Sequence, residues 1–398
     1  MAEHSKCKTA LLCRLVLGAI TMLVVGRSEA KTPQMVTDTA GSSEERNTNV
    51  DQMVQPFFQN GCHVGLSIAI VRGKDSRFYS FGSTSREKHI MPGPDNIYEI
   101  ASVTKTFTGA LAAEALQQSR MQLDADFRQY LPQQYPNLAW QGKPITLRNL
   151  AGHTSGLPRD LPNTDDLFAH RNPETLPYKL IARDSHYGRD RYLRELHSIK
   201  LHNEPGTSEN YSNLGFKVIG WGLESAYGAP FEQLMQQMIL TPLRMKSTSF
   251  ALSAHDSKRL VIGYSPAGHR MPYHLRNAGA AYGLYSTPRD MAAYVKWQLD
   301  EKDPVIALAH APIQGDAING KALVWNLDTV NGSRELSHGG GTFGMSSQVV
   351  LFPDSQQGYV LLANDACKGT EDALRNLAIS LYQASRVNKR PDAGMSTH

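Results

Sequence analysis

The chain has 398 residues, of which 41% are hydrophobic and 20% charged, so it can form one large or several small domains and is not a disordered or fibrous protein. No segment recurs at a fixed period, which excludes solenoid and propeller folds. The formal net charge is +4, and a chain without residues 1–30 (four basic and two acidic side chains) has +2, so no basic surface for nucleic acid is expected.

The N-terminus has the pattern of an export signal. Lys6, Lys8 and Arg14 precede an 11-residue apolar run, Leu15–Val25, and small residues at positions 28 and 30 mark a cleavage site. We therefore predict a signal peptide at residues 1–30 and an exported, periplasmic protein with no stable membrane span after cleavage. The alternative is an uncleaved tether, although the run is shorter than the roughly 20 residues that cross a bilayer.

The next segments predict a leader, a strand pair and a helix. Residues 31–50 are rich in Thr, Ser, Asn and charge, which indicates a flexible leader. The apolar segment Val64–Val71 predicts a strand that pairs with Arg77–Phe81 across a glycine-containing turn. An alanine-rich stretch from Ser102 to Leu116 predicts a buried helix.

The sequence predicts helices in the middle of the chain and strands towards its end. Thr287 followed by Pro288 has the pattern of a capped helix start. The clearest helices are Asn213–Ser225, Phe231–Ile239 and Glu371–Ser385, and the late strands are Ala322–Leu327, Glu335–Ser337, Ser346–Phe352 and Gly358–Ala363. This order predicts an α/β (α+β) domain from residues 51–135 and 275–398, whose sheet both ends of the chain complete. Residues 136–274 are then an inserted helical domain.

Two cysteines remain once residues 1–30 are removed, Cys62 and Cys367. In an oxidising compartment they can form one disulfide. From their positions alone, two buried free thiols are an equal alternative.

Ser102 and Lys105 are candidates for a nucleophile and its activating group. Residues three apart on a helix share a face, so the Lys105 amine can lie beside the Ser102 hydroxyl, and burial can lower the pKa of a lysine. The backbone N–H at a helix start is also free to bind an oxyanion. Ser-x-x-Lys recurs at Ser5, Ser28 and Ser85, but only Ser102 opens an apolar helix. The alternative is a plain helix cap.

Tyr211 and Asn213 form a second candidate pair. A tyrosine hydroxyl beside a lysine can act as a general base, because the cation stabilises the phenolate. The asparagine can bind both the lysine and a substrate amide. The structural alternative is an aromatic residue at a helix start with Asn213 as the cap.

A glycine run between two predicted strands is the third candidate. Backbone without side chains lets a substrate pair with the strand edge. We expect His338, Gly340, Gly341 and Thr342 to bind substrate, and the N–H groups of Gly341 and Ser102 to form an oxyanion hole. The alternative is a flexible hairpin turn.

In order and context, these motifs resemble the Ser-x-x-Lys, Tyr-x-Asn and Lys-Thr-Gly series of the serine β-lactamase and penicillin-binding protein family. The resemblance covers residues 60–385 and is strongest for class C β-lactamases and AmpH-type D-alanyl-D-alanine carboxypeptidases/endopeptidases. Further segments similar to the family are Pro144–Leu150, His153–Pro158, Pro205–Gly206 and Tyr285–Met291.

The resemblance implies an antiparallel sheet flanked by helices, an inserted all-helical domain and a site in the cleft between them. It implies acylation of Ser102 and hydrolysis of that ester with the help of Lys105 and Tyr211, without a metal or other cofactor. If the first and last strands are neighbours, as the family fold implies, Cys62 and Cys367 meet, and we hypothesise a disulfide between them.

One position departs from the family pattern, because His338 stands where the third motif has lysine. Lysine is a permanent cation that helps to bind a substrate carboxylate, whereas histidine is mostly neutral at pH 7. We therefore expect weak recognition of penicillin-type and terminal D-Ala carboxylates. This recognition should improve as the pH falls through an imidazole pKa of about 6.5.

The leading functional hypothesis is a serine hydrolase that acts through an acyl-enzyme on D-amino-acid peptides of cell-wall origin, with weak β-lactam hydrolysis beside it. The alternatives are a class C β-lactamase, an esterase or D-aminopeptidase on the same scaffold, and a non-catalytic penicillin-binding sensor. The expected partner is a small peptide, β-lactam or ester, since pocket loops and not the fold select the substrate.

Overall fold

The computed structural model describes residues 44–59, 61–273 and 277–387. The predicted signal peptide and residues 31–43 of the predicted leader lie outside this part. The described residues group into one compact unit by their contacts, so the predicted domain boundaries near 136 and 275 stay predictions. No helix of the described residues is both long and apolar enough to cross a membrane.

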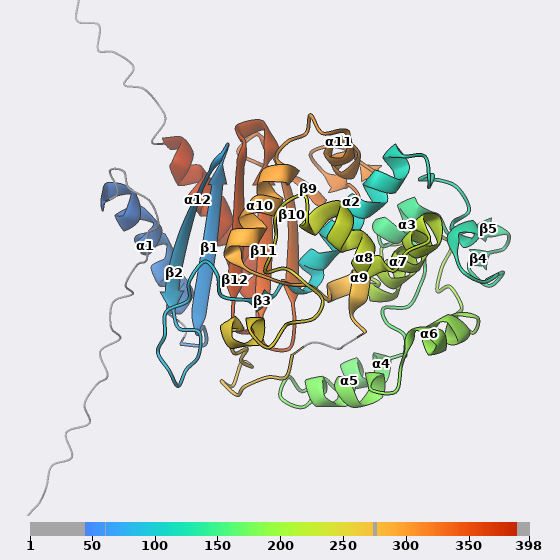
Figure 1. The fold of residues 1–398 in the computed structure, drawn as a ribbon, viewed down its shortest axis with the longest axis horizontal. Coiled ribbons are helices and arrows are strands. Elements are labelled where there is room, and N and C mark those ends of the chain that lie inside the picture. Colours follow the sequence, from blue (N-terminus) through green and yellow to red (C-terminus); the bar gives the residue numbers. More distant parts are fainter. Residues whose placement is uncertain (1–43, 60, 274–276, 388–398) are drawn as a thin grey trace, which may run out of the picture. The chain divides into compact units, whose positions relative to one another are not determined.

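An antiparallel sheet of eight strands forms the framework (Figure 1). Its order is β2-β1-β12-β11-β10-β9-β8-β7, so the first strands pair with the last, and Leu66 of β1 lies opposite Ala363 of β12. This arrangement confirms the predicted α+β fold with a sheet completed by both ends of the chain. The strands are β1 (Gly65–Arg72), β2 (Asp75–Gly82), β7 (Gln314–Gly315), β8 (Gly320–Lys321), β9 (Asn326–Val330), β10 (Ser333–Gly341), β11 (Ser346–Phe352) and β12 (Gln357–Ala363).

The predicted strand Ala322–Leu327 is wrong as one strand. β8 ends at Lys321 and β9 begins at Asn326, because the chain turns between them: Ala322 N–H donates to Trp325 C=O at 2.9 Å, and Val324 has a left-handed φ of 83°. The apolar side chains of this turn are buried, which is why the segment has the composition of a strand.

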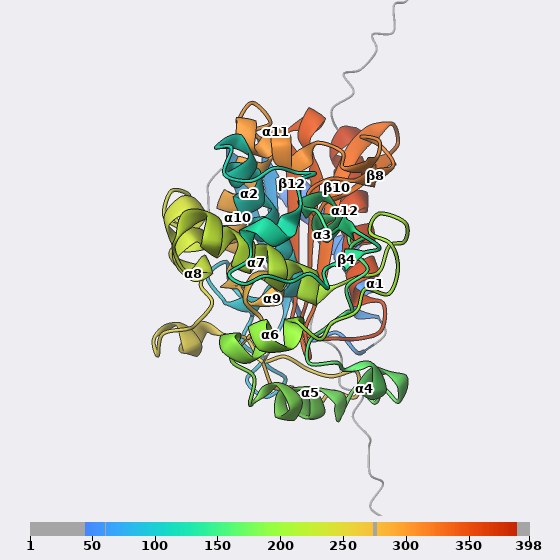
Figure 2. The same ribbon diagram turned by 90° about the vertical axis from the view of Figure 1, so that its right-hand side faces the viewer.

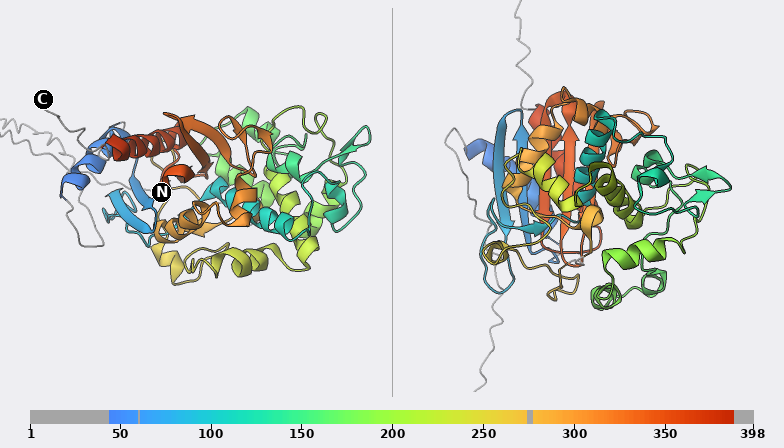
Figure 3. Two further views of the ribbon diagram at one scale, coloured as in Figure 1. Left: turned by 90° about the horizontal axis from the view of Figure 1, so that it is seen from above. Right: turned by 45° about the vertical axis from the view of Figure 1, so that its right-hand side comes forward.

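Helices cover both faces of the sheet (Figure 3). Side chains of β12 alternate between two cores: Leu361 faces α12 and α1, whereas Val360 faces α10 and the remaining helices. The helices and 3₁₀ or π turns are α1 (Glu44–Phe58), η1 (Ala101–Val103), α2 (Thr104–Gln117), η2 (Phe127–Tyr130), α3 (Leu147–Ala151), α4 (Asp165–Ala169), α5 (Leu176–Asp184), α6 (Arg189–Leu196), α7 (Asn213–Tyr227), α8 (Phe231–Met235), η3 (Gln236–Leu240), η4 (Asp256–Arg259), α9 (Gly279–Tyr282), α10 (Pro288–Gln298), α11 (Pro304–His310), η5 (Pro353–Ser355) and α12 (Thr370–Val387).

The predicted leader, residues 31–50, extends too far into the folded region. α1 already begins at Glu44, and Val50 and Val54 on this helix are buried in the core beneath α12. The polar composition of the segment hides this helix, since few apolar side chains are enough to fix it against a ready-made core.

The inserted region between 136 and 274 contains helices α3 to α8, and the side of the molecule that carries most of them faces the viewer in Figure 2. It is not all-helical, because β4 (Ala139–Trp140) and β5 (Lys143–Pro144) form a small sheet of their own. A second small sheet joins β3 (Tyr98–Glu99) to β6 (Tyr285–Ser286) near the start of α2. One continuous apolar core connects α2 and α7 with the large sheet, so this region is packed onto the rest rather than tethered to it.

The N-terminus of α10 follows the predicted capping pattern. The Thr287 hydroxyl accepts a hydrogen bond from Asp290 N–H at 3.1 Å, and Pro288 occupies the first turn, where no N–H is needed. This prediction is confirmed.

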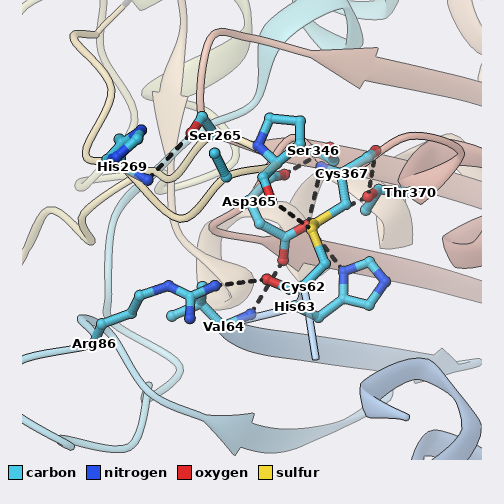
Figure 4. The surroundings of a disulfide bond; sticks show 12 residues. Cys62, His63, Val64, Arg86, Ser265, His269, Ser346, Asp365, Cys367 and Thr370 are labelled. Carbon is cyan, nitrogen blue, oxygen red and sulfur yellow. Dashed lines mark hydrogen bonds and ion pairs between the residues drawn. A yellow bond between two sulfur atoms is a disulfide. The ribbon is translucent and has the colours of Figure 1, made fainter. Parts of the chain in front are cut away.

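Cys62 and Cys367 are joined by a disulfide, with their Cα atoms 6.3 Å apart (Figure 4). Cys62 precedes β1 and Cys367 follows β12, whose pairing brings them together. The Asp365 carboxylate beside the bond accepts hydrogen bonds from His63 at 2.9 Å and from Thr370 at 3.2 Å. The disulfide therefore anchors the segment that leads into α12.

Replacing both cysteines by serine is expected to lower the free energy of unfolding by about 2–5 kcal/mol, because the bond closes a loop across a sequence separation of 305 residues. Urea unfolding of the oxidised protein and of the double variant measures the difference. The wild type treated with a reductant should match the variant. Equal stability of all three proteins would contradict this prediction.

Candidate active site

A cleft of about 980 Å³ lies at the start of α2. Its walls come from η1, the segment before α7, the end of β10, the helix α5 and the segment that leads into α12. The lining includes Ser102, Tyr211, Asn213, Gly341 and Thr342, which are candidates from three separate parts of the sequence. The fold thus brings most of the predicted site residues to one cavity.

Ser102 lies in a 3₁₀ turn that leads directly into α2. The preceding residue, Ala101, has a φ of 50°, a left-handed conformation that costs a non-glycine residue about 1–3 kcal/mol. On the other side, β10 packs so closely that a Cβ at Gly340 would lie 2.7 Å from Ser102 N. A glycine at 340 is therefore required for the strand to approach the serine backbone.

Lys105 is fully buried below the serine. Its Nζ lies 3.1 Å from Ser102 Oγ, 2.8 Å from Asn213 Oδ1 and 2.7 Å from the Ala281 carbonyl oxygen. Burial holds the pKa of this lysine well below its ordinary value, which favours the neutral amine. A neutral amine has two N–H groups, and the amide and carbonyl oxygens can only accept them. The remaining lone pair then points to the Ser102 hydroxyl, as a proton acceptor requires.

The Tyr211 hydroxyl lies 2.6 Å from Ser102 Oγ. Burial of this hydroxyl raises the pKa of Tyr211 to about 12. The Lys105 Nζ lies 4.9 Å from the centre of the tyrosine ring and makes its hydrogen bonds elsewhere. Burial thus favours the neutral phenol and the neutral amine over a phenolate stabilised by a lysine cation, and which of Tyr211 and Lys105 takes the serine proton stays a prediction.

His153 positions the tyrosine. Its ring stacks on the Tyr211 ring with 4.4 Å between the centres, and its Nδ1 accepts a hydrogen bond from Ser212 N–H at 3.1 Å. Burial lowers the pKa of His153 to about 2, so the ring is neutral and Nδ1 keeps its lone pair. His153 therefore supports Tyr211. Within the described part of the chain it makes no hydrogen bond to Ser102.

Asn213 begins α7 but does not cap it. Ser212 is the cap, since its hydroxyl accepts from Gly215 N–H at 2.9 Å. The Asn213 amide instead joins two polar groups: its oxygen accepts from Lys105, and its NH₂ donates to Asp160 Oδ1 at 3.0 Å. Asp160 thereby fixes which way the amide points.

His338 does not contribute to the cleft in the way its motif predicts. Its side chain is buried, and the lining contains Gly339, Gly341 and Thr342 but neither His338 nor Gly340. Its Nδ1 donates to the Gly339 carbonyl at 2.7 Å, and burial lowers the pKa of His338 to about 3. The expected gain of carboxylate recognition near pH 6.5 is therefore wrong, because this imidazole stays neutral far below that pH.

Several charged residues of the cleft were missed in the sequence, among them Arg159, Asp160 and Glu371. Arg159 and Asp160 directly follow His153–Pro158, and the Arg159 guanidinium lies 5.5 Å from the centre of the Tyr211 ring. Glu371 reaches the cleft from α12, where no local pattern distinguishes it from a surface residue. The sequence does contain a signal for Arg159 and Asp160, because they directly follow a segment that resembles the family. It contains no such signal for Glu371.

A group of potential metal ligands lies outside the cleft. His63, Asp365 and Cys367 place ligand atoms within 4.8 Å of one another. The Cys367 sulfur is bonded to Cys62, and the His63 Nδ1 already donates to Asp365. These contacts account for the cluster as support for the disulfide.

Comparison with known proteins places the chain in a family. The family model described as Beta-lactamase matches residues 50–384. The D-alanyl-D-alanine-carboxypeptidase/endopeptidase AmpH of Escherichia coli K12 is 30% identical over 296 residues, which cover 73% of this chain and 70% of that protein. The protein flp of Staphylococcus aureus N315 is 27% identical, over 81% of this chain and 64% of the relative.

Solved structures share the fold. A class C β-lactamase superposes with a TM-score of 0.73 at 19% identity, over 87% of this chain and 98% of the other. A β-lactamase/D-alanine carboxypeptidase from Yersinia pestis has a TM-score of 0.69 at 24% identity, over 84% and 99% of the two chains. With the matched residues 50–384, these findings show that the chain belongs to the β-lactamase family of serine hydrolases.

Proposed function

We propose that this serine hydrolase acts through an acyl-enzyme at Ser102 on D-amino-acid peptides of cell-wall origin, as a carboxypeptidase or endopeptidase. The observation that carries the proposal is the hydrogen-bonded set of Ser102, Lys105 and Tyr211, with Oγ 3.1 Å from the amine and 2.6 Å from the phenol. The peptide substrate is supported by the AmpH relative, which is named a D-alanyl-D-alanine-carboxypeptidase/endopeptidase.

Acylation begins with proton transfer from Ser102 to the neutral Lys105 amine. The serine oxygen attacks the carbonyl carbon, and the N–H groups of Ser102 and Gly341 stabilise the oxyanion. Tyr211 donates a proton to the leaving amine as the C–N bond breaks. The Lys105 ammonium then gives its proton to the Tyr211 phenolate, so both groups are neutral again and the serine proton has in effect moved to the leaving group.

Deacylation repeats these steps with water in place of the leaving amine. Water loses a proton to Lys105 while it attacks the ester, and Tyr211 returns a proton to Ser102 Oγ as the acyl group departs. Every proton movement uses groups of the chain itself.

Export of the protein is part of the proposal. The basic and apolar pattern of residues 1–30 supports a cleaved signal, and peptides of cell-wall origin are found outside the cytoplasm. The net charge of +2 that remains without residues 1–30 is compatible with small-molecule substrates.

Release of D-alanine from a peptide that ends in D-Ala-D-Ala tests the proposed activity. We expect turnover by the wild type and a decrease in kcat of about 10²–10⁴-fold in Tyr211→Phe, because proton transfer by a positioned group contributes this much. Tyr178→Phe is the matched control, since Tyr178 is an exposed tyrosine of α5.

Two outcomes would refute parts of the proposal. If the wild type hydrolyses p-nitrophenyl esters but releases no D-alanine, the protein is an esterase and not a peptidase. Equal rates for Tyr211→Phe and Tyr178→Phe on the peptide would remove Tyr211 from the mechanism.

A further inference from the structure

The cleft has no cation at the place where the family motif has lysine. His338 stands there, but its side chain is buried, neutral and absent from the cleft lining. Burial also favours the neutral form of Lys105, because it lowers the pKa of the amine. A substrate carboxylate can therefore be recognised by charge only through a cation from another segment of the cleft.

Arg159 is a cation of the cleft lining that lies beside Tyr211. Its Cζ lies 5.5 Å from the centre of the Tyr211 ring, whose hydroxyl lies 2.6 Å from Ser102 Oγ. The Arg159 carbonyl accepts hydrogen bonds from Asn213 N–H at 2.8 Å and from Leu214 N–H at 3.1 Å. The backbone of Arg159 is thus fixed to the start of α7, where the Tyr211 and Asn213 side chains also begin.

The guanidinium is held by aromatic contacts and keeps its donors. Its Cζ also lies over the Phe168 ring, 4.9 Å from the centre. Its nearest approach to Asp160 is 3.3 Å, from Nε, and Asp160 already accepts from Asn213 at 3.0 Å. Within the described residues the Arg159 side chain donates no hydrogen bond. A stacked, planar guanidinium loses little freedom on binding, and its two terminal nitrogens can hold a carboxylate as a bidentate pair.

Other cations of the cleft lining are engaged or lack this support. Lys217 donates to a buried tyrosine hydroxyl of α6 at 2.9 Å, and Arg183 donates to a carboxylate of α4 at 2.9 Å. Arg171 and Lys368 are exposed, and in the described part of the chain no hydrogen bond fixes their side chains. Among the lining cations of that part, Arg159 alone combines aromatic support with unused donors.

We propose that Arg159 binds a carboxylate group of the substrate and thereby takes the place of the motif lysine. This inference rests on the proposed function. The path from Ser102 to the guanidinium runs across the Tyr211 side chain, and one residue of extended peptide spans about 3.4 Å, so the carboxylate lies within roughly three residues of the attacked carbonyl. Two groups meet this condition, the terminal carboxylate of the released residue and an acidic group on the acyl part.

N-acetyl-D-alanyl-D-alanine and its C-terminal amide test the first group. We expect the wild type to prefer the carboxylate in kcat/KM by about 10-fold, at the lower end for a charge-assisted contact because the Arg159 side chain is 47% exposed. Arg159→Met should lose this preference through a higher KM for the carboxylate, and Arg159→Lys should keep part of it. Added salt should weaken the preference in the wild type. Mass spectrometry of released D-alanine or D-alanine amide gives the rates.

N-glutaryl- and N-pentanoyl-D-alanyl-D-alanine amide test the second group, because they differ only by a carboxylate on the acyl part. A preference for the glutaryl compound that Arg159→Met loses assigns Arg159 to the acyl part. The same result with the first pair assigns it to the released residue. Either result supports the inference.

Arg194→Met is the matched control, since Arg194 is an exposed arginine of α6 outside the cleft lining. It should keep both wild-type ratios, and melting temperatures verify that each variant is folded. Each preference compares two substrates of one protein, so a general effect of a variant on Tyr211 cancels. Wild-type ratios for both pairs in Arg159→Met overturn the inference, as does a wild type without a preference in either pair.

The same assays separate this failure from failure of the proposed function. If the wild type cleaves none of the four peptides, the proposed function fails and the inference fails with it. If the wild type cleaves them with ratios that do not depend on Arg159, only the inference fails.

Discussion

Ser102→Ala is expected to abolish covalent labelling by a fluorescent penicillin and to reduce kcat by on the order of 10⁶-fold, the loss known for removal of a nucleophile from a serine hydrolase. The alanine leaves Lys105 and Tyr211 in place, but neither is bonded to an oxygen that can attack. Intact-mass measurement after incubation with penicillin shows whether an adduct forms, and peptide mapping locates it in the wild type.

Ser85→Ala is the matched control because Ser85 also begins a Ser-x-x-Lys sequence. Its hydroxyl accepts from Lys88 N–H at 3.1 Å, so its loss affects a local turn, and Ser85 is not among the residues that line the cleft. The control should be labelled like the wild type. Labelling of Ser102→Ala at the wild-type level would show that the nucleophile lies elsewhere.

Lys105→Met is expected to reduce kcat nearly as much as Ser102→Ala, since a nucleophile and its base act as one unit. The double variant should then lose little more than either single variant. Methionine fills a similar volume, but it leaves Asn213 Oδ1 and the Ala281 carbonyl without the amine that they bind. A melting temperature near that of the wild type is needed before the rate is interpreted.

The pH dependence of the same reaction identifies the titrating group. Only the neutral Lys105 amine accepts the serine proton, so kcat/KM is present above the lowered pKa of Lys105 and decreases as the pH falls through it. His153 and His338, with pKa values of about 2 and 3, stay neutral across the range of about pH 5–8. A neutral ester measured from low to high pH should show one acid limb at the lowered pKa of Lys105, and His338→Gln should leave this limb unchanged. Loss of the limb in that variant would contradict the assignment to Lys105.

Local sequence patterns were enough to predict those elements and site residues whose structure depends on neighbours in the sequence. Ser102 and Lys105 are three apart at a helix start, and Thr287 caps α10 through Asp290, which follows three residues later. The buried strands β11 and β12 each end in an apolar run, Val349–Phe352 and Tyr359–Ala363, that is typical of a strand in the core.

The remaining features depend on contacts between distant segments. The burial of His338 follows from the helices that cover its face of β10, and its motif alone suggested a residue open to substrate. Glu371 lies beside Gly341 only because α12 packs across the sheet. The turn between β8 and β9 contains apolar residues because it is buried, so its composition gives no sign of a turn.

The pairing of β1 with β12 also determines when this protein can fold. A ribosome adds about 5–20 residues per second, so β1 waits roughly 15–60 s for a partner that follows some 300 residues later. During that time one edge of β1 is unpaired, and such an edge can pair with other chains. The last strand and α12 are needed to bury both faces of the sheet. A chain that is interrupted before β12 therefore lacks the strand that pairs with both β1 and β11. We expect such a chain to aggregate or to be degraded, and not to form a smaller folded protein.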